Sequence, residues 1–218
     1  MNVELVDIFG SDEAVCDAAR VSYGKLSAKY TKEQNGKLIE FLAKHGHWSP
    51  FSHVMLKFRI QCPIYVERQL FKHQVGVAVN SISGRYVDFS DSYTIIPIGE
   101  WRKQSKSSKQ GSEGLLEHEQ QIVADNIQAN IIIECQNAYE KLISLGVCKE
   151  QARTILPLCL NTEFIWTGSL CALIRVCGLR LKPDAQKETG SVVQKMLDLT
   201  IESGKFNQSL KAYELIKE

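Results

Sequence analysis

The sequence has no excess of either charge. Its 218 residues include 26 lysines and arginines and 25 aspartates and glutamates, which gives a formal net charge of +1. Proteins that bind duplex nucleic acid through its phosphates carry a clustered basic surface. We therefore expect no nucleic-acid partner, and a few converging arginines and lysines must hold any anionic ligand.

The sequence also lacks long apolar segments and paired cysteines. No run of about 18 apolar residues could span a bilayer, and the first residues do not combine a basic segment with an apolar run. The seven cysteines are odd in number and form no Cys-x-x-Cys pair, so neither a disulfide framework nor a zinc ribbon is indicated. These features predict a soluble, cytoplasmic protein with reduced thiols and no membrane partner.

Hydrophobic periodicity predicts a single α+β domain, residues 1–218. Residues 53–61 alternate between apolar and polar side chains, as a half-buried strand does, and Thr31 with Gln34 forms a capping box before a helix. Further strands are expected at 3–9, at about 85–89 and at about 158–166. Helices are expected at 11–23, 31–44, 63–74, 115–145, 169–180, 184–203 and 207–217.

Two segments have no clear period. Residues 75–84 are small and irregular, and we interpret them as a functional loop. Residues 102–114, RKQSKSSKQGSEG, are polar and basic, which predicts a solvated, mobile loop; gathering of phosphates is a less favoured alternative.

Three clusters of residues could carry chemistry. The first is HGHWSPFSH, residues 45–53. Three histidines suggest zinc, but the spacing matches no common structural zinc pattern and no cysteine or acidic residue is close. Helix capping, with Gly46 closing the helix and His45 and His47 near its C-terminus, is the simplest interpretation, and ligand binding is the second.

The second cluster combines a helix face with a turn. Gln69, Lys72 and His73 have i, i+3, i+4 spacing, which places them on one face of the expected helix. The sequence Ser-Ile-Ser-Gly-Arg at 81–85 then offers hydroxyls, backbone N–H groups and a guanidinium, the groups that bind phosphate. A solvated helix face followed by an ordinary turn is the alternative.

The third cluster is Arg153, Arg175 and Arg180, which lie among apolar neighbours. Such arginines are usually snorkelling side chains or halves of ion pairs. Several of them together can also form a dianion site, and the residues alone leave both interpretations open. Arg175 and Arg180 are five residues apart, so they lie on different faces of a helix.

Taken in order, six segments resemble the flavin-dependent thymidylate synthases over nearly the whole chain. They are AARVSYG (18–24), HGHWSPFSH (45–53), ERQLFKHQ (67–74), SISGRY (81–86), ARTILPL (152–158) and LRLKPDAQKE (179–188). The resemblance implies an α+β fold with a small, mainly antiparallel sheet and several helices. It also implies a homotetramer with shared active sites that methylates dUMP at C5, with methylenetetrahydrofolate as carbon donor and FAD and NADPH as reductants.

The resemblance also implies roles for individual residues, with no metal and no cysteine nucleophile. Arg180 matches the arginine that sits against the uracil ring, favours its ionised N3 form and is catalytic. The cofactor-binding residues are His47, Ser49, Lys72, His73, Gln74, Ser81, Ser169 and Arg175. The substrate-binding residues are Gln69, Lys72, Ser81, Ser83, Gly84, Arg85, Arg153 and Arg180.

Several positions depart from the family pattern, mostly on the flavin side. Lys72 and Gln74 replace both arginines of an Arg-His-Arg triplet that contacts FAD, and Ser81 replaces a glutamate. The segment before Ser83 is one residue longer. Residues 169–171 and Arg175 replace Asn-Ala-Arg and a later Asn. Lysine keeps the charge of arginine but loses its planar fork. These changes suggest two alternatives: a deoxyuridylate hydroxymethylase of the same family, or a non-catalytic nucleotide-binding paralogue.

Overall fold

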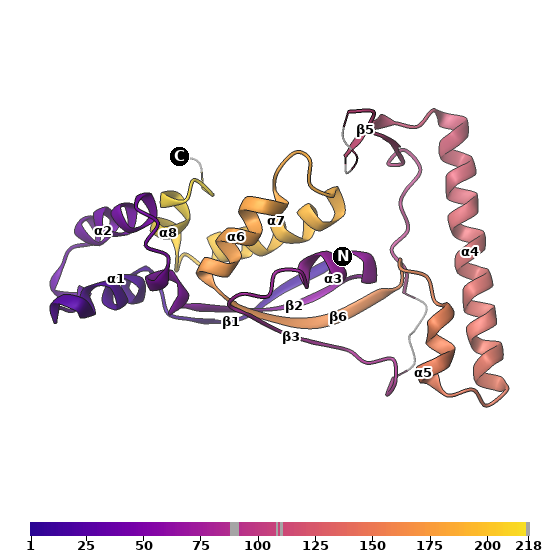
Figure 1. Cartoon of the computed structure of the whole chain (residues 1–218), viewed down its shortest axis with the longest axis horizontal. Helices are drawn as coiled ribbons and strands as arrows, with labels where there is room; N and C mark the ends of the chain where they lie inside the picture. Colours follow the sequence, from indigo (N-terminus) through magenta and orange to yellow (C-terminus); the bar gives the residue numbers. More distant parts are fainter. Residues whose placement is uncertain (88–91, 108, 110, 217–218) are drawn as a thin grey trace.

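The computed structural model describes residues 1–87, 92–107, 109 and 111–216. Its centre is a four-stranded antiparallel sheet with the order β1-β2-β6-β3 (Figure 1). The strands are β1 (Asn2–Phe9), β2 (Met55–Pro63), β6 (Asn161–Ser169) and β3 (Val77–Ser81). The predicted α+β class with a small antiparallel sheet is confirmed.

The two inner strands, β2 and β6, form the floor of the core. Alternation along β2 buries Leu56, Phe58 and Ile60 completely, as the period-two pattern predicts. Phe58 stands opposite Trp166 of β6, and the two ring centroids are 5.9 Å apart. The site elements described below therefore rest on a rigid, close-packed base.

Helices cover this sheet and extend from one end of it (Figure 1). Over the sheet lie α3 (Ile64–Leu70), α6 (Leu170–Arg180) and α7 (Lys187–Glu202). At one end lie α1 (Asp12–Arg20), α2 (Lys32–Lys44) and α8 (Asn207–Ala212). Short 3-10 turns are η1 (Val21–Tyr23), η2 (Ser27–Lys29), η3 (Ser49–Ser52) and η4 (Arg153–Ile155). The capping box of Thr31 and Gln34 is confirmed.

The segment from 63 to 87 differs from the prediction in three places. Helix α3 ends at Leu70 instead of near Gln74, so Lys72 and His73 lie in the following turn and do not share a helix face with Gln69. Residues 77–81 of the expected loop are strand β3, because their backbone pairs with β6 despite their small side chains. The expected strand at 85–89 is wrong for residues 85–87, which form a turn; residues 88 and 89 lie outside the described part.

The expected loop at 102–114 is instead a hairpin of β4 (Arg102–Gln104) and β5 (Ser112–Leu115). Gln121, which is buried on α4 (His118–Ser144), holds its base. The amide oxygen of Gln121 accepts from the backbone of Gly99 and Trp101, and its nitrogen donates to the carbonyls of Trp101 and Leu116. Because Gln121 lies outside residues 102–114, the composition of that segment could not predict the hairpin.

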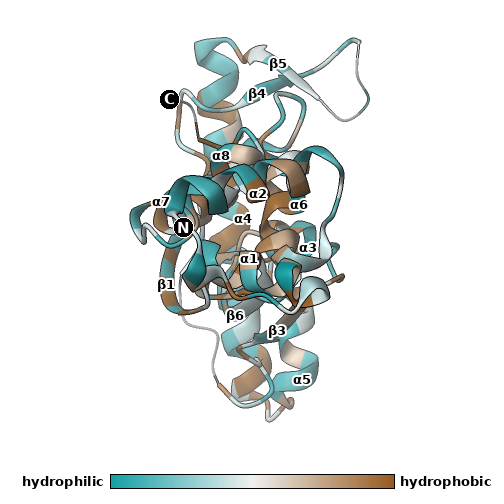
Figure 2. Ribbon diagram, turned by 90° about the vertical axis from the view of Figure 1, so that its left-hand side faces the viewer, coloured by the Kyte–Doolittle hydropathy of each residue, from teal (hydrophilic) through white to brown (hydrophobic). Residues whose placement is uncertain are grey.

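The long helix α4 lies apart from the sheet (Figure 1) and packs against α5 (Lys149–Ala152) and η4. Figure 2 shows brown, hydrophobic segments where α4 is visible behind the other elements, and several of its apolar residues are exposed: Ile122, Val123, Ile127, Ile131 and Ile133. Ile127 is 63% exposed. Across the described residues, no helix is both long and apolar enough to cross a membrane.

Candidate active site

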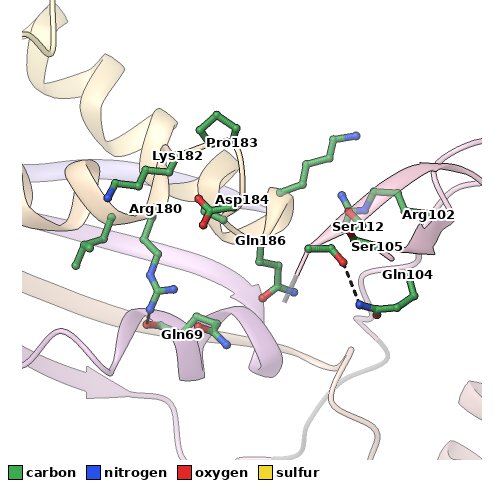
Figure 3. Close-up of a pocket in the computed structure, with 14 residues that line it drawn as sticks. Gln69, Arg102, Gln104, Ser105, Ser112, Arg180, Lys182, Pro183, Asp184 and Gln186 are labelled. Atoms are coloured by element: carbon green, nitrogen blue, oxygen red, sulfur yellow. Dashed lines mark hydrogen bonds between the residues drawn. The ribbon is translucent and has the colours of Figure 1, made fainter. Parts of the chain in front are cut away.

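A cavity of about 1120 Å³ lies between α3, the end of α6, the loop before α7 and the β4–β5 hairpin. Figure 3 shows Gln69 and Arg180 on one side of it and Arg102, Gln104, Ser105 and Ser112 of the hairpin on the other. Lys182, Asp184, Gln186 and Lys187 from the loop and the start of α7 complete the polar wall. The cavity exceeds the ~300 Å³ lower bound of small-molecule pockets several-fold, so it has room for more than one ligand.

Arg180 is the last residue of α6, and two hydrogen bonds fix its half-buried guanidinium. Its Nη2 donates to the backbone carbonyl of Gln69 at 3.1 Å, as Figure 3 shows, and its Nε donates to Nε2 of His73 at 2.9 Å. Among the described residues, its remaining guanidinium N–H groups have no hydrogen-bond partner, so they can meet a ligand in the cavity.

His73 is neutral in this arrangement, because its Nε2 accepts the bond from Arg180. Burial lowers the pKa of His73, and the positive charges of Arg180 and Arg175 lower it further. The imidazole and the guanidinium therefore form a pair with a single positive charge.

Ion pairs attach the hairpin side of the cavity to α7. Arg102 contacts Glu188 at 2.8 Å, with side chains only 27% and 17% exposed, and Lys187 contacts Glu100 at 2.9 Å. Among the described residues that line the cavity, Arg180 and Lys182 have no carboxylate partner. The net positive charge that remains suits an anionic ligand.

A second cavity, of about 490 Å³, lies beside the first two turns of α6. Arg175 lines it, and its Nη2 donates to the carbonyl of Val75 at 2.7 Å. Ser169 caps α6, because its hydroxyl accepts from the backbone N–H of Ala172. Gly76 lies so close to this hydroxyl that an added Cβ would be 3.0 Å from Oγ of Ser169. The cavity is lined by Trp48, Ser52, Met55, Val75, Gly76, Val77, Ala78, Thr167, Ser169, Cys171 and Arg175.

The lining of this second cavity fits part of a flavin nucleotide. Trp48, Met55 and Val75 offer an apolar surface for a ring, while Arg175 offers a guanidinium for phosphate. Lys72 and Gln74 are exposed in the turn just before it. The prediction that Arg175 and Arg180 lie on different faces of the helix is confirmed, because each lines a different cavity.

The predicted phosphate-binding turn lies elsewhere. The hydroxyl of Ser83 accepts from the N–H of Arg85, and the carbonyl of Ser83 accepts from Tyr86. The guanidinium of Arg85 pairs with Glu150 of α5 at 3.2 Å, and Arg153 follows directly after α5. Neither cavity is lined by Ser83, Gly84, Arg85 or Arg153, so one chain does not bring its predicted substrate residues together.

His47 follows the turn that ends α2, and Ser49 is the first residue of η3. Gly46 has a φ of 70°, and the N–H groups of Gly46 and His47 donate to the carbonyls of Ala43 and Leu42. The capping interpretation of this segment is confirmed. No group of three or more histidines, cysteines, aspartates or glutamates in the described part of the chain could hold a metal ion.

Ser81 stands where the family pattern has a glutamate, and its hydroxyl donates to the carboxylate of Glu67 at 2.7 Å. Burial raises the pKa of Glu67. A carboxylate therefore lies beside position 81, supplied by α3 instead of by the strand.

Three buried cysteines, Cys16, Cys62 and Cys177, are poorly suited to nucleophilic catalysis. Burial raises the pKa of Cys16 to about 11 and that of Cys62 and Cys177 to about 12. A thiolate is the reactive form of cysteine, and no cysteine is among the residues that line the larger cavity. Chemistry in that cavity must use charge and positioning.

Over residues 4–203, the chain matches the protein family described as thymidylate synthase complementing protein. A flavin-dependent thymidylate synthase of Thermus thermophilus is 40% identical over 201 residues, which cover 92% of this chain and 71% of that protein. The chain belongs to the flavin-dependent thymidylate synthase family. A flavin-dependent thymidylate synthase of Kosmotoga olearia is 37% identical over 186 residues, 85% of this chain and 79% of that protein.

A solved structure agrees with this family assignment. The UMP/dUMP methylase PolB from Streptomyces cacaoi, bound with 5-Br dUMP, matches with a TM-score of 0.86 and 27% identity. The match covers 99% of this chain and 95% of that chain. The resemblance seen in the six sequence segments is confirmed: the protein is an enzyme of a flavin-dependent thymidylate synthase family, and its cofactor is a flavin.

Several residues that line the cavities were not predicted from the sequence. They are Trp48, Arg102, Gln104, Ser105, Ser112, Lys182, Asp184, Gln186 and Lys187. The density of basic and hydroxyl side chains in 102–114 was a usable signal, and it supported the less favoured phosphate-gathering interpretation of that segment. Trp48 carried a weaker signal, as a large aromatic residue inside a polar motif.

Proposed function

We propose that this enzyme methylates dUMP at C5 to give dTMP, with methylenetetrahydrofolate as the carbon donor and NADPH as the reductant through FAD. The observation that carries the proposal is Arg180. Its guanidinium is held by two hydrogen bonds at the wall of a large polar cavity, and its other N–H groups bond to no residue in the described part of the chain. A preorganised positive charge of this kind stabilises negative charge that develops on a bound ring, as activation of uracil at C5 requires.

The rest of the substrate contacts form two groups. Gln69 accompanies Arg180 in the cavity, while Ser83, Gly84, Arg85 and Arg153 lie around α5 and β3. In this proposal the second group binds the phosphate, through the hydroxyl and N–H groups of the turn and the two guanidinium groups. The two groups meet on one nucleotide when they come from different copies of the chain.

The flavin contacts in this proposal are the turn 72–74, Ser81, His47 and Ser49, together with Ser169 and Arg175 at the second cavity. When bound, the reduced flavin supplies the hydride, which NADPH replenishes. The residues of the chain position the reactants, exclude water and hold charge, which are the main contributions of a protein to cofactor chemistry.

A homotetramer with shared active sites is part of the proposal. It is supported by α4, whose exposed isoleucines and valine form an apolar surface that no element of the described chain covers. A surface of this kind marks an interface, and a second copy of the same chain is the partner that also completes the substrate contacts. Cytoplasmic localisation is proposed as well, and the seven free cysteines support it.

The test is conversion of dUMP by the purified protein with FAD, NADPH and methylenetetrahydrofolate, followed by mass analysis of the nucleotide. A product heavier than dUMP by one methylene group supports the proposal. A hydroxymethyl product identifies the hydroxymethylase alternative. Binding of dUMP without flavin uptake or NADPH oxidation identifies the non-catalytic alternative.

A further inference from the structure

The early end of α3 brings two acceptors close to Arg180. The carbonyls in the last turn of a helix lack partners within the helix, and the C-terminal end favours a cation. The carbonyl of Gln69 is one of these groups, and the guanidinium of Arg180 satisfies it at 3.1 Å. Arg180 therefore caps α3 from the end of another helix, α6.

His73 provides the second acceptor. Its backbone N–H donates to the carbonyl of Leu70 at 3.0 Å, which fixes the turn after α3. Its Nε2 then accepts from Nε of Arg180 at 2.9 Å. Accepting at Nε2 requires a lone pair there, so the ring proton is on Nδ1.

These two bonds restrain the guanidinium on one side only. Nε and Nη2 face the end of α3, which directs the opposite edge of the guanidinium plane toward the cavity. Neither bond alone determines this orientation, because a guanidinium held at one nitrogen can still rotate about its own side-chain torsions.

We propose that His73 is the positioning residue for Arg180: its neutral imidazole orients the guanidinium toward the uracil ring in the cavity. The inference rests on the proposed function, since it concerns how Arg180 meets its substrate. It gives His73 a role separate from the flavin contact that the family resemblance implies.

The charges around His73 make this role sensitive to pH. The groups that face it are Arg180 and Arg175 of α6, while Lys72 adjoins it in the turn; all three are cationic. Protonation of His73 removes the acceptor at Nε2 and adds a positive charge beside Arg180. Burial and both arginines lower the pKa of His73. The hydrogen bond from Arg180 to neutral His73 is therefore fully present at any pH above the ordinary pKa of histidine. This hydrogen bond is lost as the pH falls through the lowered pKa that His73 has in the folded protein.

The experiment is a double-mutant cycle on the holoenzyme, with His73→Ala, Arg180→Ala and the double variant, read as kcat and KM for dUMP. We expect His73→Ala to lower kcat on the order of tenfold, the effect of one hydrogen bond to a charged group, and to change KM less. In the Arg180→Ala background the same substitution should cost almost nothing, because the partner is gone.

His73→Gln is the conservative variant, since its amide oxygen can accept from Arg180 but does not titrate. It should recover most of the kcat lost in His73→Ala and remove the acid limb of the kcat profile. The control is His118→Gln, an exposed histidine on α4, which should retain the wild-type profile.

Equal losses from His73→Ala in both backgrounds would overturn the inference and indicate an independent cofactor contact. An acid limb that persists in His73→Gln would also overturn it. If wild-type enzyme forms no dTMP, the proposed function fails, and the same cycle is then read as dUMP affinity by calorimetry. A loss of affinity that depends on Arg180 supports the orientation of Arg180 by His73, and an additive loss refutes it.

Discussion

Replacement of Arg180 by alanine tests the proposed chemistry most directly. The substitution removes the guanidinium and leaves the Gln69 carbonyl and Nε2 of His73 without their donor. Gln69 lines the cavity and His73 is only partly buried, so water can replace the lost donor and the stability cost should be modest, about 1 kcal/mol. The protein should therefore fold, and the activity can be measured.

The loss of activity should be much larger than the loss of stability. A preorganised charge-stabilising donor is typically worth about 2.7 to 4 kcal/mol, or roughly a hundred- to a thousandfold in rate. The interaction strengthens as negative charge grows on the ring, so turnover should fall more than dUMP affinity. Arg180→Lys keeps the charge but loses the planar fork that bonds both Gln69 and His73, so its activity should fall between the wild type and Arg180→Ala.

The assay is single-turnover oxidation of reduced flavin with methylenetetrahydrofolate at saturating dUMP. Arg59→Ala is the matched control, because Arg59 is a half-exposed arginine of β2 that makes a 3.5 Å ion pair with Glu163 and lines neither cavity. It should leave the rate unchanged. Wild-type turnover in Arg180→Ala, with only dUMP affinity reduced, would show that Arg180 is a binding residue and would refute the reasoning.

Three further predictions follow from the remaining features. Purified protein should be yellow or take up FAD stoichiometrically. Arg175→Ala should weaken FAD binding by about tenfold in a flavin-fluorescence titration, because it removes a charged hydrogen-bond donor; unchanged affinity would show that Arg175 is not part of the cofactor site. Light scattering should show a homotetramer, and Ile127→Glu on α4 should reduce the assembly by burying a charge in the interface; an active monomer would contradict this. Gly76→Ala should lower the stability by about 1 to 3 kcal/mol in denaturant unfolding, because Gly76 has a φ of +75° and an added Cβ would lie 3.0 Å from Oγ of Ser169; no change would refute the strain argument.

The inner strands and long helices were predictable because their own side chains determine them. The alternation of residues 53–61 follows from burial of one face of β2, and the capping box at Thr31 satisfies the first turn of α2 locally. The helices at 115–145 and 184–203 were predicted to within a few residues for the same reason. Each of these signals lies within the segment that it describes.

The errors concern segments that distant contacts determine. Strand β3 forms because residues 77–81 pair with the edge of β6, although residues 75–84 show no clear period in the sequence. The hairpin β4–β5 depends on Gln121, which comes later in the chain. Helix α3 ends early, where Arg180 caps it from α6. The identities of the site residues came from the motif resemblance, while the division of those residues between two cavities and the α5 region required the fold.

The side chain of Gln121 links two parts of the molecule that have different tasks. One amide group ties the base of the hairpin to α4, the helix with the exposed apolar face. The hairpin in turn lines the cavity of Arg180. In the proposed homotetramer, a displacement of α4 would reach the cavity of Arg180 through the hydrogen bonds between the Gln121 side chain and the backbone. If the proposed tetramer forms through α4, we expect its assembly to affect the shape of this cavity, so that an isolated subunit binds ligand less tightly than the assembly does.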